Sequence, residues 1–188
     1  MGKKYDSLSR LTKLVSNSSK TKKLEVLELG AGVGVTGVAF TSLVPHSQVL
    51  ITDVADAERL IMRNIAANPA ATGSKASFQT LDWSEDLPKD IASRKFDIVL
   101  VADCIYNEDS IPDLVKTLSS LAQKSPELLI MVATKTRHSS EAIFFDLAAK
   151  ARLVVGAKTT VLAPMSTEDL DDAERIDFYE FVVQAEIS

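Results

Sequence analysis

Cysteine, tryptophan and histidine are scarce in this chain of 188 residues. A single cysteine excludes a disulfide-stabilised scaffold and any zinc site built from several cysteines. The two histidines, His46 and His138, are too far apart in the sequence to form a metal-binding motif, so we predict no metal. No apolar run approaches the roughly 18 residues of a membrane span. The apolar core of a signal peptide is missing too, so we expect a cytoplasmic or nuclear protein that does not bind membranes.

Charge is unevenly distributed along the chain. Residues 1–23 carry a net charge of +6, and because the whole chain carries −5, the remainder carries −11. An acidic body repels nucleic-acid phosphates and attracts basic partners, so we expect no nucleic-acid partner. In the basic segment Leu8, Leu11 and Leu14 recur at helical spacing, which predicts a short amphipathic helix with a solvated charged face.

Strand-like and helix-like stretches alternate along most of the sequence. Short apolar runs predict strands at 24–29, 48–53, 76–81, 96–102, 127–134, 152–162 and 175–185. Helical patterns lie at 35–44, 56–67, 110–124 and 139–150. The last two strands follow each other without a helix and should pair antiparallel. We predict a single α/β domain over residues 1–188, with a Rossmann-like, mostly parallel seven-stranded sheet and helices on both faces.

A glycine-rich turn over Gly30–Gly34 follows the first predicted strand. Glycines between a strand and a helix let the backbone approach a ligand closely. The spacing of Gly32, Gly34 and Gly37 matches the dinucleotide fingerprint by letter, but S-adenosylmethionine is held by the same device. Glu28, at the end of the strand, would repel a pyrophosphate and attract the ammonium group of a methionine moiety.

Two further features bear on the choice of cofactor. Asp53 ends the second strand, where a carboxylate can accept both ribose hydroxyls, but both cofactors contain a ribose. No tyrosine in the chain is followed by lysine four residues later, so the Tyr-x-x-x-Lys pair of short-chain dehydrogenases is absent. We therefore expect S-adenosylmethionine, with a nucleotide or a glycine turn without ligand as alternatives.

Several motifs resemble one family of enzymes. The segment 26–34 is similar to the first motif of class I, seven-β-strand methyltransferases. Other segments resemble the protein-lysine methyltransferase family that includes the valosin-containing-protein lysine methyltransferase. These segments are Leu81-Asp82-Trp83, Ala102–Tyr106, and Thr136–His138 followed by Phe144-Phe145. The Asp-x-x-Tyr pattern of residues 103–106 is the most specific of these motifs. The resemblance covers residues 26–145 well and the closing strands loosely.

The resemblance implies a protein-lysine N-methyltransferase that uses S-adenosylmethionine and acts on a protein substrate with a reactive lysine. It implies that the glycines line the methionine end of this cofactor, that Glu28 supports the methionine end, and that Asp53 binds the ribose of the cofactor. Asp82 and Trp83 would contact the adenine. The implied cofactor-binding residues are Glu28, Gly30, Gly32, Gly34, Asp53, Asp82, Trp83 and Ala102, and the implied catalytic residues that face the substrate are Asp103 and Tyr106.

Some alternatives stay open. The family usually has a tryptophan before the first strand, whereas Tyr5 stands at about that place here. This departure leaves a non-catalytic cofactor-binding module possible, and a small-molecule methyltransferase is the other alternative. Residues 102–106 differ from the Asn-Pro-Pro-Tyr motif of enzymes that methylate amides or adenine amines, and the absence of a long insertion favours a protein substrate. Asp103 could instead cap a helix. We expect a monomer.

Overall fold

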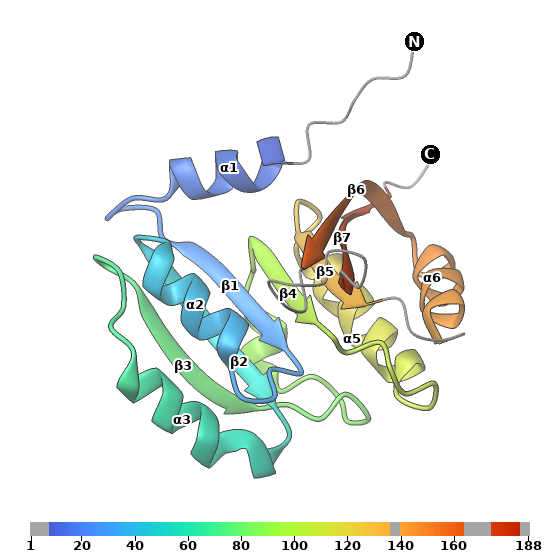
Figure 1. Cartoon of the computed structure of the whole chain (residues 1–188), viewed down its shortest axis with the longest axis horizontal. Helices are drawn as coiled ribbons and strands as arrows, with labels where there is room; N and C mark the ends of the chain where they lie inside the picture. Colours follow the sequence, from blue (N-terminus) through green and yellow to red (C-terminus); the bar gives the residue numbers. More distant parts are fainter. Residues whose placement is uncertain (1–7, 136–139, 164–173, 185–188) are drawn as a thin grey trace, which may run out of the picture.

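The computed structural model describes residues 8–135, 140–163 and 174–184, and these contain a seven-stranded sheet in the order β3-β2-β1-β4-β5-β7-β6 (Figure 1). Its strands are β1 (Leu24–Leu29), β2 (Ser47–Asp53), β3 (Lys75–Thr80), β4 (Ile98–Ala102), β5 (Leu129–Lys135), β6 (Leu153–Ala163) and β7 (Glu174–Val183). The first five strands are parallel, and β7 is antiparallel to both of its neighbours. The predicted fold class and the antiparallel pair at its end are confirmed.

Helices pack on both faces of this sheet. They are α1 (Leu8–Asn17), α2 (Val35–Leu43), α3 (Glu58–Ala67) with the short turn η1 (Ala55–Ala57), α4 (Lys89–Ser93), α5 (Ile111–Lys124) and α6 (Ser140–Lys150). The first three helices share one hydrophobic core with the sheet, and α4, α5 and α6 share another on the opposite face. Strand residues such as Val26 and Leu27 are completely buried because both faces of the central strands are covered. At 14 residues, α5 is the longest described helix and is too short to cross a membrane.

The boundaries differ from the predicted ones by a few residues. β4 and β5 begin two residues later than expected, because pairing of the strands starts at Ile98 and Leu129. The five-residue helix α4 was not predicted, since its single buried residue, Ile91, gives no helical period. The predicted start of α5 is correct, with Ser110 as the N-cap and a proline in the first turn. Asp103 therefore does not cap this helix.

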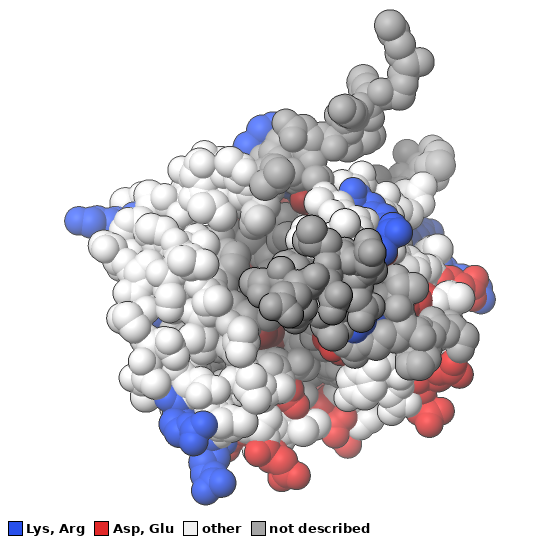
Figure 2. Space-filling view, in the orientation of Figure 1, with Lys and Arg blue, Asp and Glu red and all other residues white. Residues whose placement is uncertain are grey.

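The strand order creates a crevice at one edge of the sheet. The chain runs outward from β1 through β2 to β3 and then crosses back to β4 on the other side of β1. Such a switch in direction separates the loops that follow β1 and β4, and open α/β sheets bind ligands there. Acidic side chains gather at the lower centre and right of Figure 2, on the side toward which the parallel strands of Figure 1 run, whereas basic side chains lie at the lower left. The crevice is therefore an acidic part of the surface.

Candidate cofactor and methyl-transfer site

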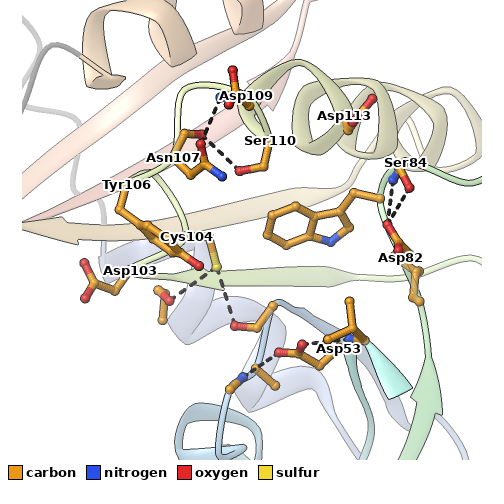
Figure 3. A pocket seen from close by; sticks show the side chains of 17 residues that line it. Asp53, Asp82, Ser84, Asp103, Cys104, Tyr106, Asn107, Asp109, Ser110 and Asp113 are labelled. Atoms are coloured by element: carbon orange, nitrogen blue, oxygen red, sulfur yellow. Dashed lines mark hydrogen bonds between the residues drawn. The ribbon is translucent and has the colours of Figure 1, made fainter. Parts of the chain in front are cut away.

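A cavity of about 670 Å³ lies at the carboxyl ends of β1, β2, β3 and β4 (Figure 3). The loops after these four strands supply its walls, as the parallel arrangement requires. The cavity brings together eight of the ten predicted site residues: Gly30, Gly32, Asp53, Asp82, Trp83, Ala102, Asp103 and Tyr106. Glu28 and Gly34 do not line it. Thr136–His138 and Tyr5 lie outside the described residues.

The glycine loop forms one wall of the cavity and depends on glycine for its shape. Gly30, Gly32 and Gly34 have φ values of 62°, 59° and 79°, in the left-handed region that other residues rarely adopt. A Cβ atom on Gly30 would lie 2.7 Å from the Trp83 ring and 2.8 Å from the Sγ of Cys104. A Cβ atom on Gly32 would meet nothing within 4 Å. The loop thus presents bare backbone to the cavity.

Asp53 fastens the glycine loop to the end of β2. Its Oδ2 accepts a hydrogen bond of 2.6 Å from the backbone N–H of Gly32, and its Oδ1 accepts one of 2.7 Å from Val54. The sequence reasoning missed this contact, which depends on how the loop folds back over β2. Each carboxylate oxygen has a second lone pair, so the same group can still accept a ligand hydroxyl. Its role at the ribose stays a prediction.

Glu28 is buried beneath the start of α2. Its Oε2 accepts a hydrogen bond of 3.0 Å from the backbone N–H of Gly37, and the Thr36 side chain also bonds to it. Burial raises the pKa of Glu28 to about 7, against the opposing effect of these hydrogen bonds. The carboxyl group therefore links the end of β1 to the first turn of α2. Its support of the methionine end of the cofactor stays a prediction.

Replacing Glu28 by glutamine should change how stability depends on pH. Because the pKa of Glu28 is raised in the folded state, its favourable contribution is complete at low pH and is lost as pH rises through about 7. At pH 8 the free energy of unfolding of Glu28→Gln should exceed that of the parent by about 1–3 kcal/mol, and the difference should shrink as pH falls below 7 and vanish near pH 4, below the ordinary pKa of a glutamate. Urea unfolding of the cofactor-free proteins between these pH values measures it. Parallel pH profiles would contradict the buried-carboxyl interpretation.

The loop after β3 forms the opposite end of the cavity. Asp82 is exposed, and its Oδ1 accepts hydrogen bonds from the backbone N–H and the hydroxyl of Ser84 at 2.9 and 2.7 Å. These bonds lower the pKa of Asp82. Trp83 is half-buried and its ring lies against Gly30. The Trp83 ring and the Asp82 carboxylate thus line the same end of the cavity, and their contact with the adenine stays a prediction.

Asp103 and Tyr106 lie at the end of the cavity away from Asp82 and Ser84 (Figure 3). The backbone of Asp103 has a φ of 56°, and its N–H donates a hydrogen bond of 2.8 Å to the carbonyl oxygen of Ala133 on β5. The side chain of Tyr106 is 67% exposed. Both side chains are therefore open to a large partner that approaches this end.

Several lining residues were not predicted. The loop after β4 and the first turn of α5 add Asn107, Asp109, Ser110 and Asp113. The helix-start signal at Ser110 could have revealed them, because a loop after β4 must face the crevice in this fold. Cys104 also lines the cavity, and burial raises its pKa to about 12, which keeps the thiol protonated at neutral pH.

The charges of the lining select for a cationic ligand. Five aspartates line the cavity, and no lysine, arginine or histidine is among its described lining residues. A pyrophosphate would be repelled here, whereas the sulfonium and ammonium groups of S-adenosylmethionine would be attracted. The bare glycine loop, the carboxylate of Asp53 and the Trp83 ring fit this cofactor. The part of the chain that the structure describes contains no group of His, Cys, Asp or Glu suited to a metal ion.

A family model for lysine methyltransferases matches residues 4–151. The chain belongs to the lysine methyltransferase family. This confirms the family predicted from the motifs, and with it S-adenosylmethionine as the cofactor. The match ends before β6 and β7, which agrees with the looser resemblance of the closing strands to the family.

Relatives in the family include protein N-lysine methyltransferase METTL21A of Mus musculus, 34% identical over 122 residues, which are 64% of this chain and 54% of the relative. Protein-lysine N-methyltransferase EFM6 of Saccharomyces cerevisiae is 32% identical over 148 residues, or 72% and 58% of the two chains. The chain spans 38 to 60% of the length of such curated relatives. A SAM-dependent methyltransferase structure from Methanosarcina mazei shares the fold, with a TM-score of 0.62 at 12% identity over 87% of this chain and 94% of that one.

Proposed function

We propose that this protein is an S-adenosylmethionine-dependent protein-lysine N-methyltransferase in which Asp103 and Tyr106 orient the substrate amine. One observation carries the proposal: a cavity built of glycine backbone and aspartates has Asp103 and the exposed Tyr106 at one end. The similarity of the chain to METTL21A and EFM6, both of which are named as protein-lysine methyltransferases, gives further support. The acidic crevice also favours a basic protein surface over nucleic acid as the partner.

The cofactor, when bound, supplies a methyl group activated by its sulfonium charge. The protein's task is to hold a lysine amine in line with that group, because most of the acceleration can come from positioning. A lysine side chain has a pKa of ~10.4 and must lose a proton before it can attack. The carboxylate of Asp103 attracts the ammonium form and raises its pKa, so Asp103 recruits and orients the lysine and does not act alone as the base. The Tyr106 hydroxyl can then align the neutral amine.

Two measurements on the purified chain test the proposal. Calorimetry should show binding of S-adenosylhomocysteine and none of NADH, because no basic group faces a pyrophosphate among the described residues of the cavity. When the protein is incubated with a cell extract and S-adenosylmethionine labelled in its methyl group, the label should be transferred to proteins of the extract. After these proteins are hydrolysed, the label should be recovered as methyl-lysine. Binding without transfer would favour the non-catalytic module, and label confined to small molecules would favour a small-molecule methyltransferase. Binding of NADH alone would overturn the proposal.

A further inference from the structure

A second hollow, which we call the sheet groove, lies on the α2 side of the sheet. It has a volume of about 350 Å³ and is lined mainly by apolar residues of β4, β5, β6 and β7, with Leu11 of α1 beside them. Its principal residues are Leu11, Met131, Ala133, Val161, Phe178 and Glu180. In Figure 1, α2 lies in front of β1 and β2, whereas β5, β6 and β7 lie to the right of this helix. Val161 is 46% exposed and Phe178 37%, so both side chains of the groove lining are accessible.

The groove adjoins the methyl-transfer site. Ala102 lines both the groove and the cofactor cavity. The next residue, Asp103, is held through its backbone to Ala133, which lines the groove. Phe178 pairs with Ala133 in the sheet, so this ring lies level with the end of β4 where the target amine is proposed to bind. A protein segment that presents its lysine to Asp103 can therefore continue directly into the groove.

One carboxylate interrupts the apolar lining. Glu180 pairs with Met131, two residues back along β5 from Ala133, which is about 7 Å at the usual rise of a strand. Glu180 is half-buried, and no hydrogen bond or ion pair joins its side chain to another described residue. Arg10 acts on the charge of Glu180 from α1, but its guanidinium donates a hydrogen bond of 2.7 Å to the carbonyl oxygen of Glu127. Burial raises the pKa of Glu180. A desolvated carboxylate of this kind gains most from a partner's cation.

We propose that the sheet groove binds the residues that flank the target lysine of the protein substrate. A bulky apolar side chain packs on Phe178 and Val161, and a lysine or arginine about two residues further along pairs with Glu180. This assignment rests on the proposed function and adds to it a substrate class: proteins in which the target lysine is followed or preceded by an apolar residue and then a basic one.

The test uses short peptides with one central lysine, randomised flanks and labelled S-adenosylmethionine. The parent should select an apolar and a basic residue on one side of the lysine. Glu180→Lys should replace the basic preference with an acidic one and lower kcat/KM for the parent's best peptide about tenfold or more. Phe178→Ala should weaken the apolar preference, chiefly through KM. Asp146→Lys, an equal charge change on α6 at the opposite face, should keep the parent's preferences.

Each outcome decides between the two proposals. Two outcomes would overturn the groove assignment and leave the proposed function intact. In the first, the protein methylates the extract and the peptides but shows no preference for the residues that flank the lysine. In the second, it methylates the extract but none of the peptides. An identical shift in Asp146→Lys and Glu180→Lys would also overturn it, because the effect would then come from net charge. A parent that binds the cofactor but methylates neither extract nor peptide would overturn the proposed function first. Thermal melts of all variants establish that the comparison is made between folded proteins.

Discussion

Replacing Asp103 by asparagine is expected to lower methyl transfer to protein by 10²-fold or more, the order seen when a positioned polar group is removed from an active site. The side chain lies at the open end of the cavity, so affinity for S-adenosylhomocysteine should stay within a few-fold of the parent. Asparagine keeps the shape of the side chain and tolerates the left-handed backbone, with a φ of 56°, at this position. Only the charge is therefore removed.

Two further variants separate charge from backbone strain. Asp103→Ala should lose activity to a similar extent and also about 1 kcal/mol of stability, because alanine is disfavoured at positive φ. Asp90→Asn makes the same charge change at an exposed residue of α4, outside the cavity, and should retain the parent's turnover. Thermal melts, calorimetry and a transfer assay on the three proteins give the result. Full activity in Asp103→Asn would remove this residue from the proposed mechanism.

The strands were predictable because their signal is local. Continuous apolar runs such as Val26-Leu27 correspond to strands that are buried on both faces. The position of β7 between β5 and β6 could not be predicted from local sequence, because the order of antiparallel strands depends on pairing partners far away in the sequence. Short α4 carries too few buried residues to give a period.

The site was predictable as a set of residues and less so as a geometry. Parallel strands end at one edge, so Asp53, Asp82 and Asp103 had to meet there. The orientation of Glu28 follows from the alternation of β1, where it shares the α2 face with Val26 and so points under that helix. The two backbone hydrogen bonds of Asp53 could not be inferred, since they depend on the path of the glycine loop.

Alanine at Gly30 is expected to weaken cofactor binding roughly ten- to a hundredfold, which corresponds to the about 1–3 kcal/mol that overpacking costs. The new Cβ would lie 2.7 Å from the Trp83 ring and 2.8 Å from the Sγ of Cys104, and both side chains line the cofactor cavity. One of them must shift, and we expect the shift to alter the wall of the cavity that receives the cofactor. The backbone, with a φ of 62°, adds strain of about 1 kcal/mol.

Gly34→Ala is the control for that strain. Gly34 has a φ of 79°, but a Cβ there would meet its nearest atoms, on Ile61, only at 3.4 Å, and the residue does not line the cavity. Its replacement should lower stability comparably while S-adenosylhomocysteine affinity stays within a few-fold. Adding Cys104→Ala to Gly30→Ala should restore part of the affinity, because it removes the Sγ that the new Cβ meets. Calorimetry and melts on these variants suffice, and equal loss of affinity in Gly30→Ala and Gly34→Ala would show that strain in the loop, and not displacement of Trp83 or Cys104, controls binding.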